Sequence, residues 1–381
     1  MFKKRFTALL LVVAVMLPFS VFGVSALSEE EITAPSAVLM EPSTRKVMFE
    51  KNSHEIRPCA SITKVMTLIL VFEAIENGKI DYTDLVTASA HAASMGGSDI
   101  WLEEGEQMTV DHMIKAVVVA SANDAAVALA EAICGTEEEF VNKMNEKAKA
   151  LGMKDTTFKN CNGLDEEGHL TSSYDVALMS AELITHEKIF EYSSIWMDTL
   201  RGGETQIVNT NKLLKSYSGI TGLKTGTTSQ AGSCMSATAQ RDGMSLVAVV
   251  LGCDTGTNRF KDCSKLLDYG FANYMVKELT LSGGALTPVK VKSGMKPTVG
   301  VTCNISKQAL LPKSGNAEIE SKIEIADELE APVEAGQKVG KVSFVYDGST
   351  VDEFDILTTE RVEKITFKSV FGFLMSKLFS F

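Results

Sequence analysis

The feature that most constrains the fold is one apolar helix near the start of the chain. Residues 61–76 contain neither glycine nor proline, their middle is almost wholly apolar, and Asn77-Gly78 supplies a helix stop. A helix that is apolar on most sides is stable only where other elements cover it. We therefore predict that this helix lies inside a domain, and 381 residues suffice for two or three domains of ordinary size.

Helical segments follow this helix, and strand-like segments lie before it and after the helical block. The spacing of apolar residues predicts further helices over 110–120, 125–133, 136–151, 175–183 and 258–276. Short apolar runs separated by turn residues predict strands over 37–41, 46–51, 220–225, 232–240 and 244–251. This order predicts an α/β domain whose sheet carries a helical insertion.

The composition changes near Leu279. From there to Ile365 the strand-like runs are short, for example 289–291, 319–325 and 341–346, and glycine or proline separates them. This pattern predicts a small all-β domain over 280–365, without obvious chemistry of its own.

The two ends of the chain are of a different kind. Lys3, Lys4 and Arg5 precede a mostly apolar run over 6–21, and small residues follow at 24–26, which is the pattern of a cleaved secretory signal. We predict that residues 1–26 are this signal, that the mature chain begins near Leu27, and that the protein is exported.

The pattern of apolar residues over 366–381, at the end of the chain, predicts an amphipathic helix. Phe367, Val370, Phe371, Leu374, Leu378 and Phe381 share one helical stripe, while Gly372 and several serines lie opposite. At 1.5 Å per residue, this helix is shorter than the bilayer core of about 30 Å. We predict peripheral attachment to the outer face of the bacterial cytoplasmic membrane. A helix docked on the protein's own surface is the alternative.

Charge and cysteine content exclude several classes. The formal net charge of -12 disfavours non-specific electrostatic binding to the phosphate backbone of nucleic acids, so no nucleic acid partner is predicted. The seven cysteines are odd in number and form no C-x-x-C pair, which favours neither a disulfide scaffold nor a zinc site. We interpret most of them as small buried side chains, and a reducing or oxygen-poor habitat is a hypothesis.

The common catalytic and cofactor motifs are missing from the sequence. It contains no G-x-S-x-G, no G-x-x-x-x-G-K-[ST], no H-E-x-x-H and no G-x-G-x-x-G. The five histidines lack metal-ligand spacing and are interpreted as surface or packing residues. Neither a metal nor a cofactor is predicted.

A serine and a lysine three positions apart provide the first candidate chemistry. Ser61-Ile62-Thr63-Lys64 places a hydroxyl and an amine on one face of the predicted helix. Lys64 can accept the proton of Ser61 only when its amine is neutral, and burial and a second nearby cation both disfavour the charged form. Ser61 at a helix start would also lie near unpaired N–H groups, which suits an oxyanion. The motif alone is equally that of an N-capping serine.

Two further motifs follow in order. Ser121-Ala122-Asn123 lies between two predicted helices, where a short loop can point a hydroxyl and an amide into a cleft. Lys224-Thr225-Gly226 ends a predicted strand. S-x-x-K, then S-x-N, then K-T-G at these spacings resembles the motif set of serine penicillin-recognising enzymes.

The resemblance extends beyond three motifs. Residues 58–64, 121–125 and 222–226, together with Gly163-Leu164 and Gly168-His169, are similar to those of the D-alanyl-D-alanine carboxypeptidases, the low-molecular-mass penicillin-binding proteins. The likeness implies an α/β (α+β) transpeptidase-like domain over 27–279, with an antiparallel sheet flanked by helices. It also implies a following β-rich domain and a C-terminal amphipathic anchor.

The same resemblance implies roles for individual residues. Ser61 would attack the carbonyl between the last two D-alanines of a peptidoglycan stem peptide and form an acyl-enzyme, with Lys64 taking its proton. Ser121 would relay that proton to the departing D-alanine. The backbone N–H groups of Ser61 and Thr227 would form the oxyanion hole.

Other residues would bind substrate by the same likeness. Asn123 would hold the substrate amide and orient Lys64, while Lys224, Thr225 and Gly226 would hold the terminal carboxylate. Arg259 would assist them, although its match rests only on Arg259-Phe260 at a helix start and a surface arginine is the alternative. Penicillins and other β-lactams are the inhibitors that the resemblance implies.

The chain departs from some relatives at Asn162, where certain members have a histidine, so no role of that histidine in deacylation carries over. Cys59, two residues before Ser61, is either a thiol that makes the site sensitive to thiol reagents or a packing residue.

Two alternatives share these motifs. A serine β-lactamase of the common group would need E-x-x-L-N, and the nearest stretch, residues 167–171, lacks the asparagine. A penicillin-binding sensor that is acylated on Ser61 without turnover is the other alternative.

Overall fold

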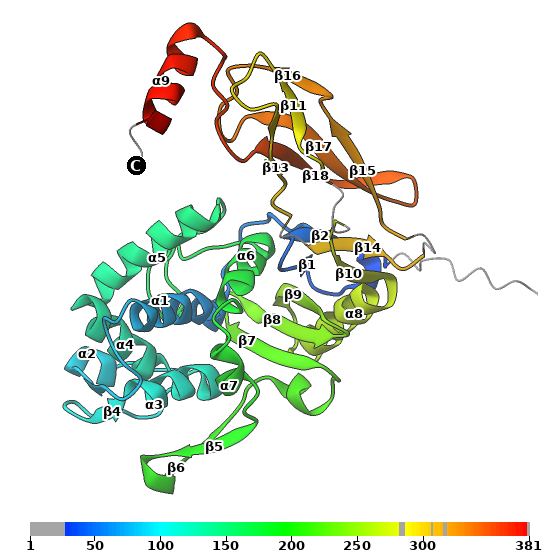
Figure 1. Cartoon of the computed structure of the whole chain (residues 1–381). Helices are drawn as coiled ribbons and strands as arrows, with labels where there is room; N and C mark the ends of the chain where they lie inside the picture. Colours follow the sequence, from blue (N-terminus) through cyan, green and yellow to red (C-terminus); the bar gives the residue numbers. More distant parts are fainter. Residues whose placement is uncertain (1–26, 282–285, 306–307, 315–317, 379–381) are drawn as a thin grey trace, which may run out of the picture.

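The structure is a computed structural model that describes residues 27–281, 286–305, 308–314 and 318–378 (Figure 1). The predicted signal segment, residues 1–26, lies outside the described residues.

A five-stranded sheet forms the centre of the first domain, in the order β2-β1-β9-β8-β7, and every neighbouring pair is antiparallel. The strands are β1 (Ser36–Glu41), β2 (Lys46–Lys51), β7 (Ile220–Thr228), β8 (Gly232–Arg241) and β9 (Met244–Cys253). The predicted strands are confirmed, and the N-terminal hairpin completes a sheet whose other strands come much later in the chain.

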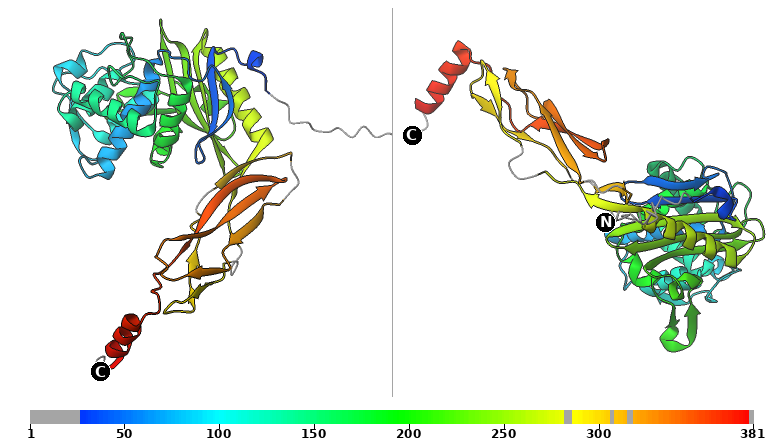
Figure 2. Two further views of the ribbon diagram at one scale, coloured as in Figure 1. Left: turned by 90° about the horizontal axis from the view of Figure 1, so that it is seen from above. Right: turned by 90° about the vertical axis from the view of Figure 1, so that its right-hand side faces the viewer.

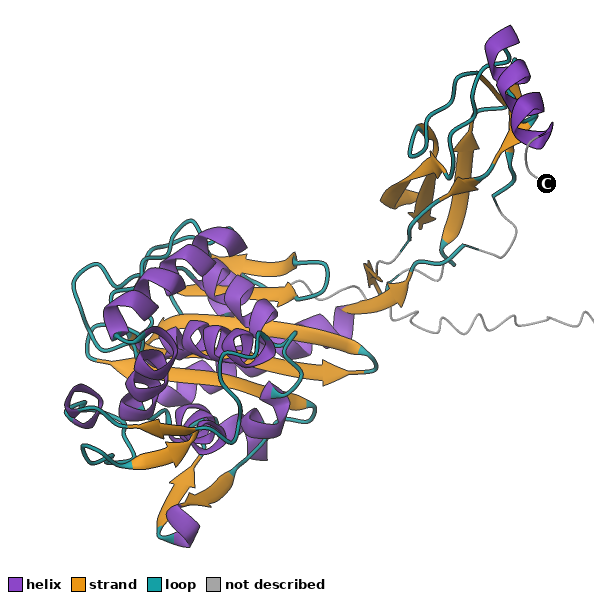
Figure 3. Cartoon of the chain, turned by 60° about the vertical axis from the view of Figure 1, so that its left-hand side comes forward, coloured by secondary structure: helices purple, strands orange, loops and turns teal. Residues whose placement is uncertain are grey.

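Helices cover both faces of this sheet (Figure 3). Side chains alternate along β9, so Val247, Val249 and Leu251 pack with α1 (Lys64–Glu76) and its neighbours, whereas Leu246 and Ala248 pack under α8 (Gly256–Asn273). Only three of the 13 residues of α1 are not buried, which confirms the prediction of an enclosed helix.

The helical block lies on the α1 side of the sheet. Its helices are α2 (Ala90–Ala93), α3 (Val110–Lys115), α4 (Asn123–Cys134), α5 (Glu137–Leu151), α6 (Ser173–Leu183) and α7 (Ile189–Ser193). Two hairpins were not predicted, β3 (Leu85–Thr87) with β4 (Gln107–Thr109) and β5 (Met197–Leu200) with β6 (Thr205–Val208). Short 3-10 turns occupy Glu29–Glu31, Ala60–Thr63, Arg201–Gly203 and Lys212–Lys215.

One predicted helix changes its type and another ends early. The prediction over 110–120 is confirmed in its bounds, with α3 followed by a π-helical turn over Ala116–Ala120. The prediction over 258–276 is wrong at its end, because α8 stops at Asn273 and β10 (Tyr274–Glu278) follows. β10 pairs antiparallel with β14 (Gln308–Pro312), so pairing with a later strand outweighs the helical spacing.

The second domain is all β, as predicted. It contains β11 (Val289–Lys292), β12 (Thr298–Val299), β13 (Val301–Thr302), β15 (Glu320–Ile325), β16 (Glu328–Glu330), β17 (Lys338–Tyr346) and β18 (Ser349–Thr358). Its sheets have the orders β12-β11-β16 and β13-β18-β17-β15. Val342, Phe344 and Ile356 form part of its separate core.

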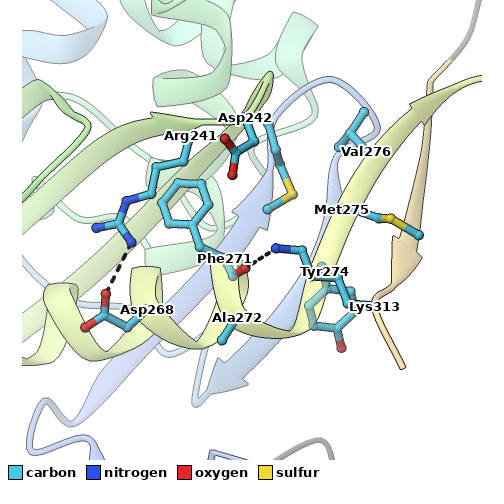
Figure 4. A pocket seen from close by; sticks show the side chains of 10 residues that line it. Arg241, Asp242, Asp268, Phe271, Ala272, Tyr274, Met275, Val276 and Lys313 are labelled. Atoms are coloured by element: carbon cyan, nitrogen blue, oxygen red, sulfur yellow. Dashed lines mark hydrogen bonds and ion pairs between the residues drawn. The ribbon is translucent and has the colours of Figure 1, made fainter. Parts of the chain in front are cut away.

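A cavity of about 390 Å³ lies where the two domains join (Figure 4). Arg241 pairs with Asp268 there, and Lys313 Nζ donates to the carbonyl of Phe271 at 2.7 Å. The cavity contains none of the predicted site residues.

The terminal helix α9 (Phe367–Leu378) lies at the end of the second domain that is remote from the first (Figure 2). Phe367 is 87% exposed, and Phe371 and Leu374 are each 54% exposed. These side chains of the predicted stripe are therefore not docked on the protein's own surface. Among the described residues, no helix combines the length and apolar character needed to cross a bilayer.

Candidate active site

Ser61 lies in a 3-10 turn, Ala60–Thr63, and the α-helix begins only at Lys64. Ser61 therefore precedes the α-helix, and the expectation that the helix starts at this serine is wrong by one turn. The residue is half-buried, so its hydroxyl stays accessible while the next nine residues are buried. Its Oγ accepts a hydrogen bond from Lys64 Nζ at 3.0 Å.

Lys64 is fully buried beside this hydroxyl. Its Nζ also donates to Asn123 Oδ1 at 2.5 Å and to the carbonyl of Asn162 at 2.6 Å. Burial removes hydration from the ammonium and lowers the pKa of Lys64 to about 7. Near neutral pH a substantial fraction of this amine is therefore unprotonated, as a base for Ser61 requires.

Ser121 follows the π-helical turn and adopts a left-handed conformation, with φ at 61°. Such a conformation is unfavourable for a residue other than glycine and is found preferentially at functional sites, as are π-helical turns. The next residues turn into α4, so that Asn123 is its first residue and projects Oδ1 toward Lys64. Asn123 Nδ2 is held by the carbonyl of Gly96 at 2.6 Å.

Lys224 is the second buried lysine and comes from β7. Its Nζ donates to Ser121 Oγ at 2.8 Å and to the carbonyl of Thr225 at 3.0 Å. Burial, and then the charges of Lys64 and Arg259, hold the pKa of Lys224 well below its usual range. The K-T-G motif lies inside β7, which continues to Thr228, so the expectation that the motif ends its strand is wrong.

The remaining predicted residues gather around the same strand. Arg259, in the first turn of α8, donates from Nη1 to the carbonyl of Gly226 at 2.9 Å and to Thr227 Oγ1 at 2.8 Å. The structure thus joins Arg259 to the K-T-G strand, although it was the least distinctive match in the sequence. Thr225 Oγ1 donates to Thr210 Oγ1 at 2.6 Å.

Two glycines allow the backbone around Ser61 to be approached closely. A Cβ on Gly226 would lie 2.9 Å from the backbone nitrogen of Ser61, and one on Gly163 would lie 2.0 Å from the carbonyl oxygen of Ala60. Neither position can hold another residue without a shift of the backbone. β7 and the loop around Gly163 therefore pack directly on the turn that carries the nucleophile.

The structure brings all nine predicted site residues together through these contacts. They are Ser61, Lys64, Ser121, Asn123, Lys224, Thr225, Gly226, Thr227 and Arg259. The sequence analysis missed the carbonyl of Asn162, which accepts from Lys64, and Thr210, which lies in a polar stretch without any distinguishing pattern.

Cys59 is a packing residue in this structure. Its side chain is fully buried, and burial raises the pKa of its thiol to about 12. A thiol that remains protonated is a poor target for thiol reagents, which favours the second of the two interpretations of Cys59. All seven cysteines are free, and five of them are buried.

No cluster of three or more residues suited to a metal ion occurs within the described ranges.

Comparisons with known proteins agree with this geometry. The model of the Peptidase S11 family, described as D-alanyl-D-alanine carboxypeptidase, matches residues 23–255. The model described as the C-terminal domain of penicillin-binding protein 5 matches residues 274–364.

Individual relatives cover most of the chain. A D-alanyl-D-alanine carboxypeptidase DacF of Bacillus subtilis is 43% identical over 345 residues, which are 89% of this chain and 88% of the relative. The crystal structure of penicillin-binding protein 5 from Haemophilus influenzae superposes with a TM-score of 0.80 at 31% identity, covering 89% of this chain and all of that one. Penicillin-binding protein D2 of Listeria monocytogenes, in an ampicillin-bound form, has a TM-score of 0.58 at 33% identity and covers 63% of this chain and 98% of its own.

Proposed function

The chain belongs to the Peptidase S11 family of D-alanyl-D-alanine carboxypeptidases, and from that premise we propose that Ser61 is the nucleophile that removes the terminal D-alanine of peptidoglycan stem peptides. The observation that carries this assignment is the hydrogen bond of 3.0 Å between Ser61 Oγ and the buried Lys64 Nζ. A neutral amine at this distance can accept the hydroxyl proton directly as the oxygen attacks.

Acylation then proceeds with the chain's own groups. Ser61 Oγ bonds to the carbonyl carbon between the two D-alanines while its proton passes to Lys64 Nζ. The carbonyl oxygen becomes an oxyanion, which the backbone N–H groups of Ser61 and Thr227 stabilise. The C–N bond breaks, the proton reaches the departing D-alanine through Ser121, and an ester remains on Ser61.

Water completes the reaction by attacking this ester, and Lys64 again serves as the base. Asn123 fixes the position of the amine through its Oδ1 and offers its amide to the substrate backbone. The carboxylate of the terminal D-alanine is held by Lys224, Thr225, Gly226 and Arg259, and the guanidinium of Arg259 supplies the positive charge that favours an anion. β-Lactams acylate the same serine because their ring amide takes the place of the D-Ala-D-Ala peptide bond.

Mass spectrometry of a D-Ala-D-Ala pentapeptide tests the reaction class. Incubation is expected to remove one alanine residue from the carboxyl end, whereas penicillin is expected to form a long-lived adduct. Rapid penicillin hydrolysis without loss of alanine would instead identify a serine β-lactamase. A stable penicillin adduct without peptide cleavage would identify a sensor.

We also propose how the chain is divided and located. Residues 1–26 act as an export signal, 27–279 form the catalytic domain, 280–365 form the β domain, and 366–381 attach the enzyme to the outer face of the cytoplasmic membrane. The exposure of Phe367, Phe371 and Leu374 supports this attachment, because an apolar helical stripe without a protein partner binds well at a bilayer surface.

Removal of residues 367–381 is expected to move the enzyme from the membrane fraction to the soluble fraction, with hydrolysis of soluble peptides unchanged. Sedimentation of cell extracts measures the distribution. Phe367→Ser/Phe371→Ser is the variant of full length. Gly372→Ser is the matched control outside the stripe, because Gly372 is exposed and an added Cβ would meet no atom within 4 Å. Membrane retention equal to that of the unaltered chain would show that this helix is not the anchor.

A further inference from the structure

A buried histidine that the mechanism does not use contacts the motif of the nucleophile. His169 is 4% exposed, and its Nε2 lies 2.7 Å from Oγ1 of Thr63, one of the two residues between Ser61 and Lys64 that the S-x-x-K motif leaves unspecified. Its ring also packs edge-on against Phe158, with centroids 5.8 Å apart. The position of this ring is therefore fixed by contacts on both sides.

The hydrogen bonds around His169 show which atom is the donor at each step from His169 through Thr63 to Ala60. The backbone N–H of Lys159 donates to Nδ1 at 3.1 Å, so Nδ1 is an acceptor and the ring proton resides on Nε2. Burial lowers the pKa of His169 to about 4, which keeps the ring neutral at neutral pH. Nε2 thus donates to Thr63 Oγ1, and Thr63 in turn donates to the carbonyl oxygen of Ala60 at 2.9 Å.

This carbonyl belongs to the peptide that carries the N–H of Ser61. A peptide unit is planar, so fixing the direction of the Ala60 C=O also fixes the opposite direction of the Ser61 N–H. Ala60 has a φ of 51°, a conformation that costs energy for a residue other than glycine and persists only when its surroundings impose it. Hydrogen bonding at the carbonyl also polarises the peptide and strengthens its N–H as a donor.

We propose that His169 and Thr63 are positioning residues, which aim the backbone N–H of Ser61 at the oxyanion through the Ala60–Ser61 peptide. The proposal rests on the proposed function, because it assigns that N–H to the oxyanion hole. His169 connects the loop over residues 157–171 to the turn that carries Ser61. The same loop also supplies the carbonyl of Asn162, which accepts a hydrogen bond from Lys64. One loop thereby orients both the base and an oxyanion donor.

Thr63→Val tests the hydroxyl at nearly constant volume. Because the oxyanion forms only in the transition state, kcat for D-alanine release and the rate of penicillin acylation are expected to fall about tenfold, with KM little changed. Loss of an entire oxyanion donor, typically about a hundredfold to a thousandfold, sets the upper limit. Thr63→Ser keeps the hydroxyl and is expected to restore the rate to within a few-fold of the unaltered enzyme.

A matched pair at His169 separates positioning from simple support of the loop. His169→Gln can keep a donor near Thr63, whereas His169→Asn can keep only the acceptor near Lys159. The proposal expects His169→Asn to lower kcat as Thr63→Val does and His169→Gln to retain most of it. The double variant Thr63→Val/His169→Asn should be no slower than the slower of the two single variants, because both changes break one chain of donors.

The outcomes are distinguishable from those of the proposed function. If the unaltered enzyme releases no D-alanine, the proposed function fails. If it is active but Thr63→Val has the same kcat, or if His169→Asn is active while His169→Gln is impaired, the positioning role is overturned. Thermal unfolding of each variant verifies folding, and if Thr63→Val does not fold, the two His169 variants alone decide.

Discussion

Ser61→Ala is expected to abolish both labelling by a fluorescent penicillin and release of D-alanine. Without Oγ no acyl-enzyme can form, and loss of the nucleophile in serine hydrolases lowers kcat by roughly a millionfold, which is below detection in either assay. The fold should survive, because Ser61 is half-buried and its Oγ accepts a single hydrogen bond, from Lys64.

Ser194→Ala is the matched control, since that exposed serine donates only to the carbonyl of Phe190 on α7. Gel fluorescence after incubation with the penicillin and mass spectrometry of the peptide give the two readouts. Labelling of Ser61→Ala at the unaltered rate would exclude Ser61 as the nucleophile.

Lys64→Gln is expected to lower kcat/KM by a factor on the order of 10² to 10⁴, the usual contribution of a general base. Glutamine keeps a donor for the surrounding acceptors but cannot take a proton at neutral pH. The dependence of kcat/KM on pH provides the more specific test, because it reports the pKa of the catalytic base in the free enzyme.

In the unaltered enzyme, kcat/KM should rise as the pH increases through about 7 and then level off, because burial lowers the pKa of Lys64 to about 7. Below that pH the ammonium predominates and cannot accept the proton of Ser61, so the rate falls about tenfold per pH unit. This fall of kcat/KM below pH 7 should disappear in Lys64→Gln, whereas Lys212→Gln, the control at an exposed lysine, should retain it. If the fall persists in Lys64→Gln, the titrating group is not Lys64.

Much of the site could be predicted from sequence because its chemistry is encoded in short, local motifs. The spacing of Ser61 and Lys64 survives the replacement of an α-helical turn by a 3-10 turn, since both bring residues three apart onto one side. The sheet and the helical block could also be predicted, because apolar periodicity reflects burial directly.

Other features depend on pairings between distant residues and leave no local pattern. Tyr274 to Val276 fit the helical spacing, yet pairing with β14 makes them a strand. The contact of Thr63 with His169 spans 106 positions, and a threonine inside a motif gives no indication of its partner. The left-handed conformation of Ser121 is likewise imposed by packing rather than by its residue type.

The place of β1 in the sheet has a consequence for the order of events during biogenesis. This early strand bonds on one side to β2 and on the other to β9, which ends at Cys253. The catalytic domain therefore has a high contact order. The edge of β1 that pairs with β9 stays unpaired until nearly the whole domain has been synthesised. Because β7 and β8 are also missing during that interval, Ser61 and Lys64 emerge long before Lys224 can join them, and the nascent chain has no working acylation centre.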